Sequence, residues 1–178
     1  KNLIGTFYFA NKILIDTNFL KTLNEYEYKC GLGEIVKYAF IEKSCKNEEF
    51  YNLIEYLSKN DINYIKNNID YLIKICARLK ATVVEKDRLE GGLRKILNLG
   101  HTFAHPIETL SNYKNFSHGQ AVAYGIKFAT KLAFNLKKID INYFNQINAI
   151  IDKLELANQK IKYSPNKIVA LMTQDKKV

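Results

Sequence analysis

Hydrophobic residues recur at helical spacing through most of the chain. The longest pattern predicts an amphipathic helix from about residue 61 into the 80s, because apolar residues three or four positions apart share one face of an α-helix. A second pattern begins near His118, and a third covers residues 144–154. The three sets are Ile62, Ile65, Ile69, Leu72, Ile73, Cys76 and Leu79; Val122, Ile126, Ala129, Leu132, Ala133 and Leu136; and Phe144, Ile147, Ile151 and Leu154. These sets predict a mostly helical protein.

Shorter segments complete this picture. Residues 30–43 and 47–57 are expected to form two shorter helices. Ser164 followed by Pro165 predicts the start of a last helix, since serine caps helix N-termini and proline suits the first helical position. The stretch KILID at residues 12–16 is apolar and bounded by polar residues, which favours a short strand. The expected fold class is therefore mainly α, a single multi-helix domain with one short strand near the N-terminus.

Composition limits the classes of partner. The chain has 178 residues, 47% of them hydrophobic, which suffices for one domain with a core. Its formal net charge is +9, but only three residues are arginine and the lysines are spread along the chain. Nucleic-acid readers usually cluster basic residues and rely on arginine, so we expect no nucleic-acid partner and favour a phosphorylated small molecule. Three cysteines without a CxxC pair, and no apolar run near the ~20 residues that span a bilayer, predict a reduced cytoplasmic protein without a membrane partner.

A stripe of polar residues includes two of the three histidines. Its members follow each other at steps of four, four, three and four, so they would share one face of a continuous helix. They are Glu90, Arg94, Asn98, His101 and His105, set against apolar Leu93, Ile96, Leu97 and Phe103. An isolated histidine is usually a structural residue, but five such residues in register favour a functional site.

The third histidine offers a route to a metal site. His118 begins the next expected helix, and the loop at residues 111–117 could fold it back onto the stripe. Two imidazoles and one carboxylate form a catalytic zinc set that leaves a position open for substrate. Glu34, in GLGEIVKYAF, is the candidate carboxylate, because a glutamate in an apolar helical run needs a cation. The alternative is an ordinary surface pair between Glu34 and Lys37, one turn later.

The residues around the histidines indicate the kind of substrate. His101-Thr-Phe-Ala-His105 lacks the glutamate of HExxH metalloproteases, which disfavours peptide hydrolysis. Lysine and arginine bind phosphate and carboxylate groups, so nearby basic residues favour a polyanionic substrate. The candidates are Lys37, Lys80, Arg94, Lys176 and Lys177, although each alone is more often a solvated side chain.

Five ordered motifs carry a family resemblance: KNLIGTF, GLGEIVKYAFIE, KATVVEKDRLEGGLRKILNLGHTFAHPIE, HGQAVAYGI and DKK. In this order and spacing they resemble 3-dehydroquinate synthase over nearly the whole chain. The resemblance implies the helical C-terminal domain of a two-domain enzyme with a glycerol-dehydrogenase-like layout. Residues 1–23 would be the end of the nucleotide-binding domain or a connector, and residues 24–178 the helical metal- and substrate-binding domain. No GxGxxG fingerprint occurs, so we expect the NAD-binding domain upstream in a longer protein and no turnover by this chain alone.

The resemblance also implies a role for each candidate residue. The ligands of a divalent metal, zinc or another such as cobalt, would be Glu34, His101 and His118, which selects His101 over His105. Catalytic roles would belong to His105, Glu90 and Lys37. Substrate contacts would come from Lys80, Arg94, Asn98 and one of Lys176 and Lys177. The edge of the NAD site would include Lys1, Phe19, Leu20, Lys21 and Thr22.

Members of this family convert 3-deoxy-D-arabino-heptulosonate 7-phosphate to 3-dehydroquinate and phosphate in the shikimate pathway, which leads to aromatic amino acids. The resemblance implies transient oxidation by NAD, elimination of phosphate, return of the hydride and closure of the ring by an intramolecular aldol step. It also implies a homodimer for the full-length protein. Pro106 stands where the family usually has alanine, and a proline inside a helix removes a hydrogen bond and can kink the axis, which leaves the orientation of His105 open.

Two alternatives stay open at this point. The first is another sugar-phosphate cyclase or a metal-dependent polyol dehydrogenase on the same scaffold, although the dehydrogenase would not need Lys80, Arg94 and Asn98 for a phosphate. The second is a non-catalytic basic helical module, which predicts no metal and strongly salt-dependent binding. The second alternative leaves the polar stripe unexplained.

Overall fold

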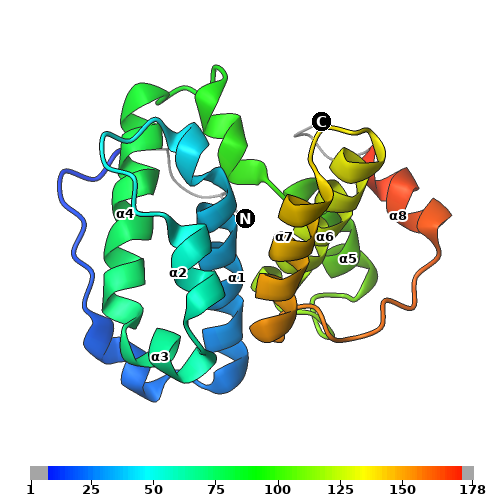
Figure 1. Cartoon of the computed structure of the whole chain (residues 1–178), viewed down its shortest axis with the longest axis horizontal. Helices are drawn as coiled ribbons and strands as arrows, with labels where there is room; N and C mark the ends of the chain where they lie inside the picture. Colours follow the sequence, from blue (N-terminus) through cyan, green and yellow to red (C-terminus); the bar gives the residue numbers. More distant parts are fainter. Residues whose placement is uncertain (1–7, 174–178) are drawn as a thin grey trace.

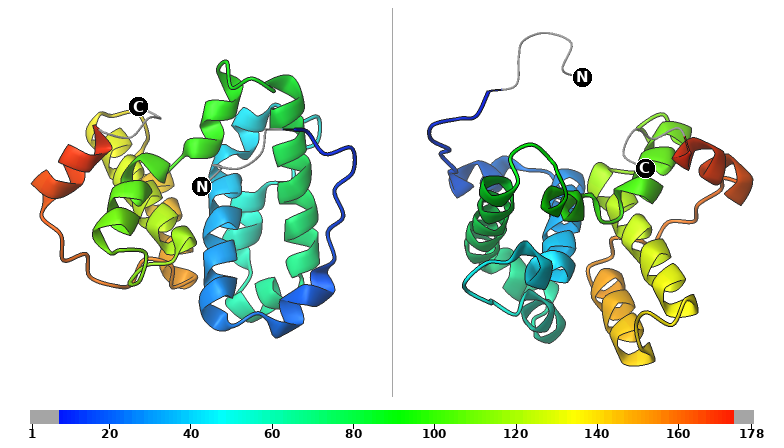
Figure 2. Two further views of the ribbon diagram at one scale, coloured as in Figure 1. Left: turned by 180° about the vertical axis from the view of Figure 1, so that it is seen from behind. Right: turned by 90° about the horizontal axis from the view of Figure 1, so that it is seen from above.

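The computed structural model describes residues 8–173, which form helices joined by turns and loops. In chain order the elements are η1 (Thr17–Thr22), α1 (Glu25–Ile41), η2 (Glu42–Cys45), α2 (Leu53–Lys59), α3 (Ile62–Asn67), α4 (Ile69–Lys86), η3 (Leu93–Asn98), α5 (His101–Leu110), α6 (His118–Asn135), α7 (Ile141–Lys153) and α8 (Pro165–Met172), where η denotes a 3₁₀-helix. Helices α1–α4 form one group and α5–α8 a second group beside it (Figure 1). The same two groups are seen from behind and from above in Figure 2. The prediction of a mainly α fold is confirmed.

Apolar faces at helical spacing form the core, as the sequence pattern requires. On α4 the buried residues are Leu72, Ile75, Leu79 and Val83, spaced three, four and four apart. On α7 they are Ile147, Ile150 and Ile151. The first half of α6 is buried almost all round, because α1 packs on one side of it and α5 on another. Since α1, α5 and α6 meet in this way, residues at their ends and centres come close together.

Side-chain caps determine where several helices begin. Ser117 accepts a hydrogen bond from the backbone N–H of Gln120, and the Gln120 side chain accepts one from the backbone N–H of Ser117. This reciprocal capping box makes His118 the first residue of α6. The last helix begins at Pro165, as predicted, although the Ser164 side chain makes no capping hydrogen bond.

The strand predicted at residues 12–16 is wrong. These residues adopt no regular structure, and Ile13, Leu14 and Ile15 are 77%, 82% and 56% exposed. A strand requires a neighbouring strand for its backbone hydrogen bonds, and residues 8–173 contain none. The local pattern identified an apolar segment, but such a pattern does not show whether a neighbouring strand is present to pair with it.

The polar stripe does not lie on one continuous helix, which corrects a second prediction. Helix α4 ends at Lys86, a turn follows, and Gly100 has a positive φ of 82° before α5 begins. Glu90 therefore lies in the turn, the next two members of the stripe lie on η3, and the two histidines lie on α5. The long helix expected from residue 61 is likewise divided, because Asn68 departs from helical geometry between α3 and α4. The helix expected from residue 47 begins only at Leu53.

A partly buried lysine connects the two groups of helices. Lys153, the last residue of α7, donates hydrogen bonds to the carbonyl oxygens of Leu57, Ser58 and Asn60 at the end of α2. The distances to Ser58 and Asn60 are 3.0 and 2.7 Å. The ammonium group thereby satisfies carbonyls that have no partner at a helix C-terminus.

Candidate metal centre and active site

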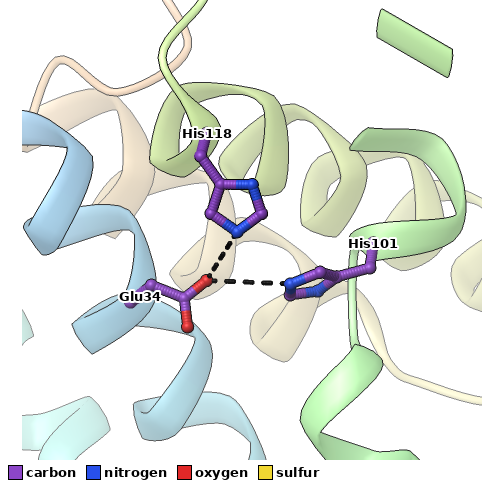
Figure 3. A group of neighbouring side chains, drawn as sticks. All are labelled: Glu34, His101 and His118. Carbon is purple, nitrogen blue, oxygen red and sulfur yellow. Dashed lines mark ion pairs between the residues drawn. The ribbon is translucent and has the colours of Figure 1, made fainter. Parts of the chain in front are cut away.

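Three potential metal ligands converge where α1, α5 and α6 meet (Figure 3). Glu34 lies in the middle of α1, and His101 and His118 are the first residues of their helices. Glu34 Oε1 lies 3.8 Å from His101 Nε2 and 3.4 Å from His118 Nε2. One ligand atom from each residue lies within 4.8 Å of the others. The structure thus brings together all three residues that were predicted as metal ligands.

The surroundings of Glu34 fit a divalent metal. Its Oε1 atom is buried and accepts no hydrogen bond of good geometry, although it lies between the two imidazole nitrogens. In tetrahedral zinc sites, ligand distances of about 2.1 Å separate neighbouring ligand atoms by roughly 3.4 Å, which is close to both distances seen here. A buried carboxylate oxygen without a hydrogen bond is costly, and a cation held between the three side chains would remove that cost.

His101 presents its Nε2 atom to this centre as a neutral group. Its Nδ1 lies 3.2 Å from the carbonyl oxygen of Leu99, so Nδ1–H donates there and Nε2 carries the lone pair. Burial, followed by the nearby charge of Lys37, lowers the pKa of His101 to about 4. At neutral pH the imidazole is therefore already in the form that binds a metal.

His118 is oriented by a carboxylate on each side. Its Nδ1 lies 3.0 Å from Glu108 Oε1, and its Nε2 faces Glu34. The hydrogen bond with Glu108, followed by the close approach of the Glu34 carboxylate, raises the pKa of His118 to about 10. Burial alone would raise the pKa of Glu34, but His118 and Lys37 outweigh it and lower that pKa to about 2. In the metal-free protein Glu34 and His118 therefore form an ion pair. A bound metal would replace the proton of His118 that faces Glu34.

Glycines allow the three ligand-bearing segments to approach. Gly33, next to Glu34, lies so close to α6 that a Cβ atom built on it would stand 2.3 Å from the carbonyl oxygen of Gly119, next to His118. A Cβ atom on Gly119 would stand 1.9 Å from the Cys30 carbonyl oxygen. Gly125 makes a similar approach to the Gly100 carbonyl, which adjoins His101. Each ligand is therefore next to a glycine in a close backbone contact.

Several residues predicted to act on the substrate lie near the metal ligands, and they differ in their burial and contacts. Lys37 is only 4% exposed, and its Nζ forms an ion pair with Glu34 Oε2. His105, one turn after His101 on α5, is half-buried, and the two rings lie edge to face with centroids 5.6 Å apart. The proline that follows His105 lies inside α5, and the helix continues past it to Leu110. Asn98, at the end of η3, is half-buried.

An aspartate shapes the turn that carries two further candidates. The Asp87 carboxylate accepts hydrogen bonds from the backbone N–H groups of Gly91, Gly92 and Arg94, at 2.7, 2.9 and 2.8 Å. Within this turn Arg94 Nε lies 3.3 Å from Glu90 Oε1. The structure thus pairs Glu90 with Arg94 but leaves the Glu90 side chain mostly exposed.

The remaining candidates lie around a cavity or outside the described residues. An apolar cavity of about 360 Å³ lies between η1, α1 and α4, and Leu20, Glu34 and Lys80 are among the residues that line it. On η1, Phe19, Lys21 and Thr22 are exposed. Lys1, Lys176 and Lys177 lie outside residues 8–173.

Sequence reasoning missed Glu108. It is 7% exposed and lies on α5 seven residues after His101, on the same face of the helix two turns further on. That spacing was a usable signal, but a glutamate near the end of a helix is common on protein surfaces. Only the packing of α5 against α6 shows that this carboxylate is buried against His118.

Residues 31–178 match the family of the 3-dehydroquinate synthase C-terminal domain. The chain belongs to this family. It is 40% identical to a 3-dehydroquinate synthase of Acetivibrio thermocellus over 100% of the chain and 48% of the relative. It is 42% identical to that of Dictyoglomus turgidum over 97% of the chain and 46% of the relative. The resemblance to the helical domain of 3-dehydroquinate synthase is confirmed.

The chain spans about half the length of the curated relatives it matches. A 3-dehydroquinate synthase of Nitratiruptor is 47% identical over 75% of the chain and 36% of the relative. In the described residues, no helix combines the length and apolar composition that a membrane crossing requires.

Proposed function

We propose that this chain is the metal- and substrate-binding part of a 3-dehydroquinate synthase. The full protein would be a phosphorus–oxygen lyase that converts 3-deoxy-D-arabino-heptulosonate 7-phosphate to 3-dehydroquinate and phosphate with NAD and a divalent metal. The observation that supports this most directly is the buried Glu34 Oε1 between His101 Nε2 and His118 Nε2. Relatives named 3-dehydroquinate synthase, at 40% and 42% identity over nearly the whole chain, support the choice of reaction.

The three ligands would hold one divalent metal with a coordination position open to substrate. Such a metal supplies a Lewis acid that polarises substrate oxygen atoms. The residues around it fix the ligand atoms: the Leu99 carbonyl orients His101, and Glu108 orients His118. Ligands held in this way need no rearrangement when substrate binds.

The polar residues beside the metal ligands would bind and orient the polyanionic substrate. Arg94, Asn98 and Lys80, with one of the two C-terminal lysines, would contact its phosphate, carboxylate and hydroxyl groups. Lys37 is buried beside Glu34 and would contribute a cation at the inner end of the site. Holding a flexible sugar phosphate in one conformation lowers the entropic barrier to ring closure.

Proton transfer would fall to His105 and Glu90. The His105 ring lies against that of His101, so it would face a substrate bound at the metal. Oxidation and reduction belong to NAD, whose site Lys1 and residues 19–22 would border from this side. The proposal includes a homodimer for the full-length protein, a cytoplasmic location, and no turnover by this chain alone.

Zinc content measured by elemental analysis tests the metal site, with His105→Ala as the matched control for His101→Ala. Both variants remove an imidazole from α5, one turn apart, but only His101 faces Glu34 Oε1. We expect about one zinc per chain in the unmodified protein and in His105→Ala, and little in His101→Ala. Equal zinc content in the two variants would overturn the ligand assignment.

Phosphate release by the full-length enzyme tests the reaction. With 3-deoxy-D-arabino-heptulosonate 7-phosphate and NAD, the unmodified enzyme should release phosphate and form 3-dehydroquinate. His105→Ala should retain zinc and lose most of this activity. A full-length enzyme that binds zinc but leaves this substrate unchanged would favour another sugar-phosphate cyclase on the same scaffold.

A further inference from the structure

Glu108 is a buried carboxylate to which none of the expected roles applies. It lies near the end of α5, is 7% exposed, and reaches the first residue of α6. Its Oε1 atom lies 3.0 Å from His118 Nδ1. The backbone carbonyl of Glu108 accepts hydrogen bonds from the Ser111 hydroxyl and from the backbone N–H of Tyr113, which hold this end of the helix in place.

The contact decides which nitrogen His118 can offer to a metal. A carboxylate accepts hydrogen bonds but does not donate them, so His118 Nδ1 must carry the proton that Glu108 binds. The lone pair is then available only at Nε2, which is the atom 3.4 Å from Glu34 Oε1. The His118 side chain is 40% exposed, so packing alone restricts its ring far less than it restricts that of His101, at 11%.

Helix α5 therefore contributes to the centre twice. Its first residue, His101, offers Nε2 directly, and its own Nδ1 is bound by a backbone carbonyl. Two turns later, Glu108 performs for His118 the task that the Leu99 carbonyl performs for His101. A carboxylate in this place also adds a negative charge near the cation and makes the imidazole a stronger donor.

We propose that Glu108 is a positioning residue for metal binding, which holds the His118 ring with Nε2 directed at the centre. This inference rests on the proposed metal site. Removal of a hydrogen-bonding partner behind a metal-bound histidine typically weakens metal affinity about 10–100-fold. Glu108 itself would not touch the metal, so its removal should weaken binding without abolishing it.

The test is zinc affinity of the 178-residue chain, measured by competition with a fluorescent zinc chelator. Glu108→Ala should bind zinc about 10–100-fold more weakly than the unmodified protein. Glu108→Gln keeps an oxygen acceptor at nearly the same place and loses only the charge, so its affinity should fall between the two. Glu155→Ala, at a more exposed glutamate that pairs with Lys29, is the matched control and should leave affinity unchanged.

A second measurement separates positioning from general destabilisation. Long-range ¹H–¹⁵N NMR of the zinc-bound protein shows which nitrogen of His118 binds the metal. We expect Nε2 alone in the unmodified protein and in Glu108→Gln, and loss of this preference in Glu108→Ala. Unchanged affinity and exclusive Nε2 binding in Glu108→Ala would overturn the inference about Glu108 and leave the metal site intact. Failure of the unmodified chain and of the full-length protein to bind zinc would overturn the metal site itself.

Discussion

Gly33 on α1 and Gly119 on α6 are in direct backbone contact, with room for no side chain between them. A Cβ atom on Gly33 would stand 2.3 Å from the Gly119 carbonyl oxygen, a distance that real Cβ atoms essentially never show. Each glycine is the chain neighbour of a proposed metal ligand. The separation of Glu34 and His118 thus depends on how closely two helix backbones can approach.

Gly33→Ala should weaken both stability and zinc affinity. The added methyl group meets backbone atoms, which cannot rotate away, so α1 and α6 must separate at a cost of roughly 1–3 kcal/mol. Gly31→Ala is the matched control. Gly31 lies on the same helix, but a Cβ atom there meets nothing within 4 Å. It should stabilise the protein by roughly 0.5–1 kcal/mol through helix propensity. Thermal unfolding with and without zinc measures both effects, and equal behaviour of the two variants would contradict the close contact.

The metal-free protein should lose stability as the pH rises from neutral toward 10. Glu108 and Glu34 raise the pKa of His118 to about 10, from about 6.5 in the unfolded chain. Below about 6.5 both states hold the proton and the stabilisation is complete; between the two values only the folded state holds it, so stability falls. Thermal unfolding in chelator at several pH values should show this decline in the unmodified protein and a smaller decline in His118→Gln. The same slope in both would mean that His118 does not carry the extra proton.

The helical part of the fold could be predicted because burial imposes a local spacing that the sequence displays. Helix α7 was found from a pattern that includes Ile147 and Ile151, and both of these residues are buried in the structure. The strand at residues 12–16 could not be judged in this way, since a strand is stabilised by hydrogen bonds to residues that local pattern does not reveal. The interruptions between helices were also missed. Polar residues three and four positions apart suggest one continuous helix, and this spacing does not reveal that Gly100 changes the direction of the chain.

The candidate site could be predicted where the residue types themselves indicate the chemistry. Two histidines and a glutamate in an apolar run pointed to a metal, and the family resemblance selected His101 over His105. The orienting contacts could not be found in this way, since Glu108 becomes distinctive only through its burial against α6. The close approach at Gly33 was likewise invisible, because a glycine in a sequence does not show which backbone will pack against it.

Two cysteines should resist thiol reagents while the protein is folded. Burial, followed by the charge of Glu42, raises the pKa of Cys45 to about 11. Burial, followed by the charge of Glu34, raises the pKa of Cys76 to about 12. Because only the thiolate reacts, labelling at pH 8 should be far slower at both residues in the folded chain than after unfolding in guanidinium. Peptide mapping of the labelled sites measures this, and fast labelling of Cys45 in the folded protein would contradict its burial.

Lys153→Met should destabilise the protein by separating the two groups of helices. The Lys153 ammonium satisfies three carbonyl oxygens at the end of α2, and methionine would keep the apolar stem but leave those carbonyls unpaired. The expected loss is roughly 1–3 kcal/mol in the free energy of unfolding. Lys127→Met is the matched control, since Lys127 pairs with the exposed carboxylate of Asp152 and should contribute roughly 0–1 kcal/mol. Urea unfolding measures both values. Equal losses in the two variants would show that the three carbonyls find other partners, and hydrogen exchange at residues 57–60 would then stay slow in Lys153→Met.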